Sequence, residues 1–160
     1  MKFDASRVPR PPITRGAKDR EPGGQDAVSE INPWAVLVAA LSCFLLGGLW
    51  YSPALFGKAW NKAAGRPAKA TSRGTHPAKV FALSFVFAIL AATAFSAWVG
   101  PHPTFQAAVT QGLFAGGCFV AASFGINYQF ADRGVKLWVI DAGYHTVQFL
   151  LFGTVFWMWP

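Results

Sequence analysis

The chain has 160 residues and a formal charge of +7, yet 13% of its residues are charged and 53% are hydrophobic. Soluble domains carry about 25% charged residues, so the composition argues against an ordinary soluble fold. After Lys79 the sequence contains two further basic residues and two acidic ones. Long segments that are nearly free of charge are typical of a protein that crosses a membrane several times.

The basic excess does not indicate a nucleic-acid partner, because a nucleic-acid-binding domain gathers its basic residues on one face of a folded unit. Here six basic residues precede Ile31, six lie from Lys58 to Lys79, and the last two are Arg133 and Lys136. The last eight flank apolar segments. We therefore expect the bilayer and its anionic lipid headgroups to be the partners of these residues.

Residues 1–30 differ from the rest of the chain, because they are rich in Pro, Gly and charge and contain few residues that could be buried. This composition predicts a disordered N-terminal tail. The tail lacks the apolar core of a signal peptide. A mis-assigned start is an alternative, since a chain that began at Val28 would open almost directly on the first apolar segment.

Residues 31–160 form the predicted membrane domain, with apolar segments at about 34–52, 80–99, 105–126 and 138–159. Each is close to the ~20 residues that a helix needs to cross ~30 Å of hydrocarbon. Helices also satisfy their backbone polar groups within the segment, as lipid requires. The predicted fold class is all-α, an integral membrane four-helix bundle with a disordered N-terminal tail.

The first segment ends in "GLWYSPALFGKAW", Gly48 to Trp60. Pro53 disfavours further helix. Trp50, Tyr51 and Trp60 have apolar rings with a polar edge, which suits the headgroup level of a membrane. We therefore interpret this stretch as a membrane exit followed by a short piece of chain along the surface.

The loop charges predict an orientation. The loop from Lys58 to Lys79 and the loop with Arg133 and Lys136 share one side of the membrane, and basic loops face the cytoplasm. The other side then has both termini and the uncharged turn "GPHP" at 100–103. We predict a multi-pass protein of the bacterial inner membrane with both termini outside the cytoplasm.

Polar residues inside the fourth segment are the candidate site. Asp141, His145 and Gln148 follow one another at i, i+4 and i+7, so they share one helix face, which should point into the bundle. Further polar residues near the same level complete the candidate site: Tyr51, Asn127, Arg133 and Tyr144. Arg133 and Lys79 are the cations expected within reach of Asp141.

Two interpretations of this face compete. In the first, Asp141 pairs with a cation or caps backbone groups, and His145 and Gln148 form hydrogen bonds between helices. In the second, Asp141 and His145 relay protons or bind a cationic substrate, since ionisable residues inside membranes are often functional. The first favours a non-enzymatic bundle and the second a small transporter or proton-coupled permease. A membrane enzyme acting on a lipid-soluble substrate is a further alternative.

Small residues form a row along the third segment: Gly112, Gly116, Gly117 and Gly125. Small faces let helices approach closely, so we expect these glycines to pack within the bundle, and the sequence leaves a homo-oligomer open. The motifs of common catalytic, nucleotide-binding and metal sites are missing. We therefore predict no catalytic residue, no metal and no cofactor.

Three stretches resemble the family known as domain of unknown function 1761: "INPWAVLVAALSCFLLGGLWYSPALFGKAW", "NYQFADRG" and "IDAGYHTVQFLLFG". The resemblance covers the chain from about Ile31 to the C-terminus. It implies four spans and small bacterial membrane proteins, and it carries no assigned activity. Asn127, Arg133, Asp141 and Tyr144, together with Gly143, match polar or glycine positions of these motifs, and the long tail departs from the family pattern.

Overall fold

The structure is a computed structural model that describes residues 31–65 and 76–160. The predicted tail at 1–30 lies outside these ranges. The described residues form helices and no strand, which confirms the all-α helical bundle. The helices in chain order are α2 (Pro33–Trp50), α3 (Gly57–Ala63), α4 (Pro77–Val99), α5 (Phe105–Leu113), a π-helical segment η2 (Phe114–Val120), α6 (Ala121–Phe130) and α7 (Val135–Met158).

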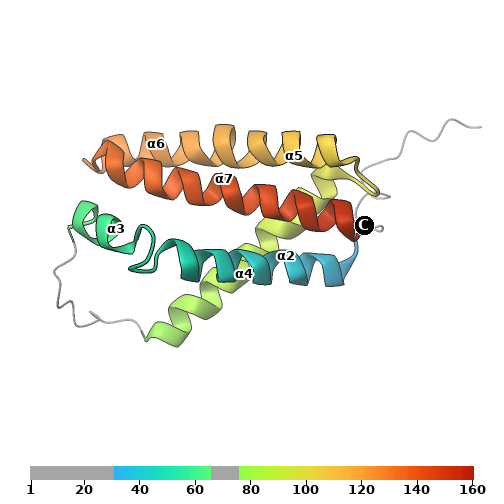
Figure 1. Ribbon diagram of the computed structural model, residues 1–160, viewed down its shortest axis with the longest axis horizontal. Helices are drawn as coiled ribbons and strands as arrows, with labels where there is room; N and C mark the ends of the chain where they lie inside the picture. The colour runs from blue at the N-terminus through green and yellow to red at the C-terminus, as the bar shows by residue number, and fades with distance from the viewer. Residues whose placement is uncertain (1–30, 66–75) are drawn as a thin grey trace, which may run out of the picture.

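Helix α7 is the centre of the bundle, because it contacts every other helical element of the described chain. α5, η2 and α6 run as one rod along one side of it, and α2 runs along the other side (Figure 1). α4 crosses α2 obliquely, so its first half stands away from the rest of the bundle (Figure 1). The polar residues of the candidate site therefore belong to the helix that the others surround.

Three of the described helical segments are long and apolar enough to cross a membrane: Pro33–Trp50, Pro77–Val99 and Phe105–Phe130. α7 is 24 residues long, but Lys136, Asp141, His145 and Gln148 lower its hydropathy. Asp141 and Gln148 are buried among the other helices. The helix with the polar residues thus occupies the interior, while the apolar helices surround it.

Local caps explain where the helices begin. The Asn32 side chain accepts hydrogen bonds from the backbone N–H groups of Trp34 and Ala35, and Pro33 follows at the first helical position. α4 begins at Pro77, ahead of the apolar segment at 80–99, because His76 Nδ1 accepts a hydrogen bond from the Ala78 backbone N–H. Side-chain acceptors at these positions satisfy backbone donors that have no partner within the helix.

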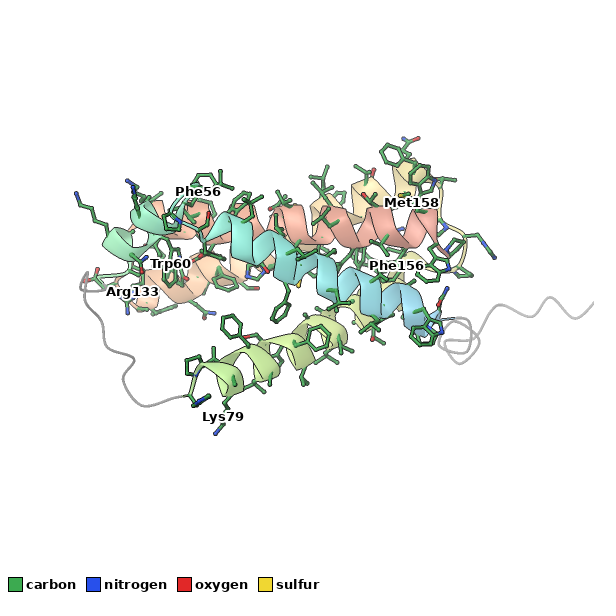
Figure 2. All side chains as sticks on the ribbon, turned by 60° about the horizontal axis from the view of Figure 1, so that its bottom comes forward. Phe56, Trp60, Lys79, Arg133, Phe156 and Met158 are labelled. Atoms are coloured by element: carbon green, nitrogen blue, oxygen red, sulfur yellow. The ribbon has the colours of Figure 1, made fainter. Side chains whose placement is uncertain are left out.

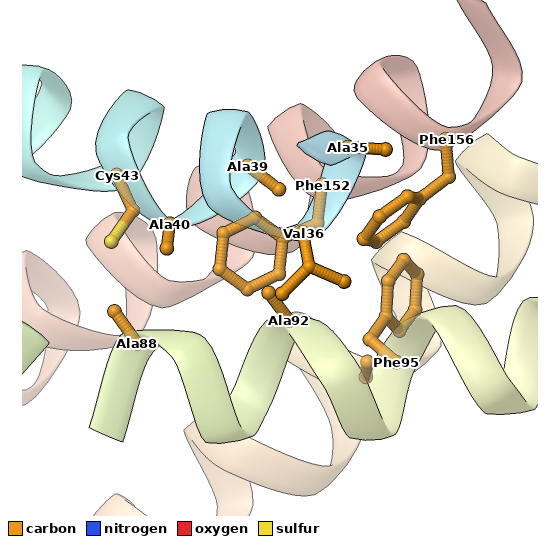
Figure 3. Packing of buried hydrophobic residues seen from close by; sticks show 11 residues of the cluster. Ala35, Val36, Ala39, Ala40, Cys43, Ala88, Ala92, Phe95, Phe152 and Phe156 are labelled. Carbon is orange, nitrogen blue, oxygen red and sulfur yellow. The ribbon is translucent and has the colours of Figure 1, made fainter. Parts of the chain in front are cut away.

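The apolar core lies where α2, α4 and α7 meet. Phe152 of α7 is fully buried there, against the small residues of α2 and α4 that let the helices approach (Figure 3). Phe95 stacks edge-on against Phe149, with ring centroids 5.3 Å apart. The core cluster consists of Ala35, Val36, Ala39, Ala40, Cys43, Ala88, Ala92, Phe95, Ala115, Phe152 and Phe156.

Glycines bring the rod of α5, η2 and α6 against α7. A Cβ on Gly112 would lie 2.7 Å from the Phe149 carbonyl oxygen, and one on Gly116 would lie 2.6 Å from the His145 carbonyl oxygen. Such distances leave no room for a side chain. A Cβ added to the next residue, Gly117, would lie 3.8 Å from the Thr146 side chain, which is an ordinary van der Waals contact.

The pair Gly116 and Gly117 allows a matched test of this packing. Gly116→Ala should lower the free energy of unfolding by about 1–3 kcal/mol, because α7 must move to admit the methyl group. Gly117→Ala should leave stability unchanged or raise it by up to about 1 kcal/mol through helix propensity. Thermal unfolding of the detergent-solubilised protein measures both, and equal effects would contradict the close packing.

Candidate functional site

Asp141 is buried, with 5% of its surface exposed, and its carboxylate accepts three hydrogen bonds from aromatic side chains. The Tyr51 hydroxyl and the Trp60 indole N–H both donate to Oδ1 at 2.8 Å. The Tyr128 hydroxyl donates to Oδ2 at 2.7 Å. An ionised carboxylate only accepts hydrogen bonds, so three converging donors match its chemistry. We call Asp141, Tyr51, Trp60 and Tyr128 the carboxylate cluster.

The three donors come from separate parts of the chain. Tyr51 directly follows α2, Trp60 lies on α3 and Tyr128 lies near the end of α6. The turn between α2 and α3 is held by hydrogen bonds from the backbone N–H of Phe56 to the Trp50 carbonyl and from that of Gly57 to the Ser52 carbonyl, and α3 packs against α7. A Cβ on Gly57 would collide with the Tyr51 carbonyl oxygen. This tight turn is what aims Trp60 at the carboxylate.

The expected cationic partner of Asp141 is not found among the described residues, where neutral donors take its place. Arg133 and Asn127 are exposed, and no described hydrogen bond or ion pair joins either side chain to Asp141. Lys79 stands at the outer end of α4 (Figure 2). Neutral aromatic donors suit a site inside a membrane, because they satisfy the carboxylate without bringing a second charge out of water.

His145, Gln148 and Tyr144 face a different environment from Asp141. His145 Nδ1 and Gln148 Oε1 are 2.8 Å apart, and the Tyr144 hydroxyl donates to the Cys43 carbonyl at 3.1 Å. All three residues line a groove of about 710 Å³ between α2, α4, η2 and α7. Asp141 does not line it. The helix face predicted as one site is thus divided into the carboxylate cluster and this groove.

Sequence reasoning missed Trp60 and Tyr128 as partners of Asp141. The sequence predicts Trp60 at the membrane surface and assigns no role to Tyr128. The structure turns other aromatics inward as well: the Trp50 indole donates to the Ile140 carbonyl at 3.1 Å and the Trp138 indole to the Ala121 carbonyl at 2.8 Å. The available signal was the cluster of aromatics with N–H or O–H groups near the one acid inside a predicted span.

Within the described ranges, no three side chains of the His, Cys, Asp and Glu types come together as metal ligands would. Cys43 is a buried free thiol and Cys118 an exposed one. The polar side chains that could take part in binding or chemistry are therefore the Asp141 carboxylate, which accepts three hydrogen bonds, and the pair His145 and Gln148 at the side of the groove. This arrangement can hold a partner by hydrogen bonds and apolar contact.

The fold and the site together define a helical bundle in which α7, the helix with the buried Asp141, is central and contacts the other described helices. A family model described as "Protein of unknown function (DUF1761)" matches residues 34–157. The chain belongs to this family, whose function is unknown. Comparison with curated proteins and with solved structures gave no match.

The carboxylate cluster predicts different outcomes for two substitutions. Asp141→Asn should lower the free energy of unfolding by about 1 kcal/mol, because the amide oxygen still accepts from Tyr51 and Trp60 and the Tyr128 hydroxyl can turn to accept. Asp141→Leu should cost about 3 kcal/mol or more, since it leaves three donors without an acceptor. Thermal unfolding in detergent compares the two.

Adding Tyr128→Phe to Asp141→Leu provides the control. It removes one stranded donor, so part of the stability lost in Asp141→Leu should return. If Asp141→Leu is as mild as Asp141→Asn, the carboxylate does not hold the cluster together.

Proposed function

We propose that the chain is a multi-pass integral membrane protein that acts without catalysis and in which Asp141 has a structural role. The observation that carries the proposal is the convergence of three neutral donors on the buried Asp141 carboxylate, where α2 and α6 end. A carboxylate that accepts from three directions is poorly placed to exchange a proton or bind a cation. Its hydrogen bonds fasten α3 and the ends of α2 and α6 to α7.

The surface of α4 supports placement in a bilayer. Between Val80 and Leu90, six large apolar residues of α4 are exposed, a density that a protein surrounded by water rarely shows on one helix. Lipid would cover this surface without cost, because the hydrocarbon is as apolar as the side chains. These residues are Val80, Phe81, Leu83, Val86, Phe87 and Leu90.

The charges support an orientation within an inner membrane. Four basic residues are exposed at one end of the bundle: Lys58 and Lys62 on α3, Arg133 between α6 and α7, and Lys136 at the start of α7. The opposite end has the turn after α4 and the contact between the Asn32 side chain and the Pro160 carbonyl. The proposal places the basic end in the cytoplasm, against anionic headgroups.

Cysteine labelling tests this orientation. In a variant with Cys43 and Cys118 replaced by Ala, single cysteines at Lys62 and His102 should differ in intact cells. His102→Cys should react with an impermeant thiol reagent in intact cells. Lys62→Cys should react with it only after the cells are lysed. The variant without cysteines controls for background, and the opposite pattern would reverse the topology.

A small proton-coupled transporter is the second candidate, because the groove reaches His145, which lies one helical turn from Asp141 on α7. If the role of Asp141 is structural, proteoliposomes that contain the wild-type protein should show no more proton flux than empty vesicles. The flux is measured with an internal pH dye under an imposed membrane potential. A flux that appears with the wild-type protein and disappears in Asp141→Asn would instead establish the transporter.

A further inference from the structure

The groove is formed where α4 leaves the core. Cys43 and Ala88 belong both to the buried core and to the groove lining, so the groove continues the seam between α2 and α4. Beyond them the oblique course of α4 takes it away from α2 (Figure 2). The volume of about 710 Å³ falls in the range of about 300–1,000 Å³ that is usual for small-molecule sites.

The mouth of the groove is apolar and faces outward. Val80, Phe81 and Phe87 line it, and 49%, 64% and 59% of their surfaces are exposed. On a helix that crosses a bilayer, this side is the one that meets lipid. A molecule could therefore enter from the hydrocarbon without passing through water.

The inner wall carries the pair His145 and Gln148. Since Gln148 Oε1 accepts from Nδ1–H, the other ring nitrogen of the neutral imidazole, Nε2, is an acceptor. The Gln148 amide nitrogen is a donor. Neither nitrogen has a hydrogen-bond partner among the described residues. The buried polar side-chain atoms without a partner in the described chain are Ser52 Oγ and Gln111 Oε1, so the two nitrogens are not fully enclosed. Both nitrogens are therefore at least partly accessible, and both residues line the groove.

The π-helical segment holds this pair in place. Val120, the last residue of η2, lines the groove, and Gly116 in the same segment lies directly against the His145 backbone. π-Helical turns inside α-helices occur frequently at functional sites. This is a second observation, separate from the groove itself, that points to a site at His145.

We propose that the groove binds an uncharged, lipid-soluble molecule that ends in a hydroxyl group, such as a long-chain alcohol. A hydroxyl donates one hydrogen bond and accepts others, which matches the acceptor at His145 and the donor at Gln148. The described lining contains no Lys, Arg, Asp or Glu, so a charged headgroup would be left unpaired. The apolar tail would lie along Phe81, Phe87 and the first half of α4. This inference goes beyond the structural role proposed for Asp141 and does not depend on it.

Photolabelling of the full chain in nanodiscs tests the proposal. The probe is a photoreactive analogue of hexadecanol, and the competitors are unlabelled hexadecanol, hexadecane and palmitate. Label should map to the groove-facing residues of α4 and α7. Hexadecanol should compete about tenfold better than the other two. Hexadecane leaves His145 and Gln148 without a hydrogen-bond partner, and palmitate brings a charge into the groove.

Two neighbours on α4 provide matched variants. Ala91 lines the groove, whereas Leu90 is 63% exposed and does not. Ala91→Trp should fill the groove and reduce specific labelling about tenfold, while Leu90→Trp should leave it unchanged. Gln148→Met keeps the size of the side chain and should abolish the preference for hexadecanol over hexadecane.

Three results would overturn the proposal. Labelling that is equal in Ala91→Trp and the wild type would show that the groove is not the site. Equal competition by hexadecane would show that the polar pair recognises nothing. Labelling that spreads to lipid-facing residues such as Leu45 and Val139 and resists competition would show ordinary contact with lipid.

Discussion

The structure depends on the need to satisfy one carboxylate inside a helical bundle. Asp141 lies on α7, which every other element contacts, so its environment is built by the whole chain. An ionised carboxylate removed from water is costly unless its oxygens accept hydrogen bonds. Three donors from the ends of α2 and α6 and from α3 meet that need. The short helix α3 is thereby held against the bundle by the indole of Trp60.

The same need to satisfy polar groups explains why α7 is central and why the more apolar helices lie around it. The three apolar helical segments can face lipid along most of their length, whereas α7 contains groups that lipid cannot satisfy. Aromatic N–H and O–H groups then serve as links between helices: Trp50 and Tyr144 join α2 to α7, and Trp138 joins α7 to α6. Each link combines an apolar ring that packs well with one donor that is used.

The sequence was sufficient to predict the helical bundle and the burial of Asp141, because long apolar runs and an isolated acid have few alternatives in a membrane. It placed Tyr51 in the candidate site but did not predict Trp60 and Tyr128 as partners of Asp141. Charge alone pointed to Arg133 and Lys79, but Tyr51 and Trp60 lie 90 and 81 residues away along the chain, and nothing local indicates which way a surface aromatic turns. The π-helical geometry of η2 was also not predicted, although Gly116 does mark the close approach of this segment to α7.

Tyr51 lies between the carboxylate cluster and the groove and belongs to both. Its hydroxyl donates to Asp141, its ring lies 5.2 Å from that of Tyr144, and it lines the groove. Loss of the carboxylate cluster would therefore disturb the groove wall through Tyr51. The reverse effect is less direct, because Ala91 lies on α4 and no hydrogen bond of the cluster involves a residue of α4. Substitutions at Asp141 can therefore change binding in the groove through Tyr51, whereas a substitution at Ala91 tests the groove without removing a donor or an acceptor of the cluster.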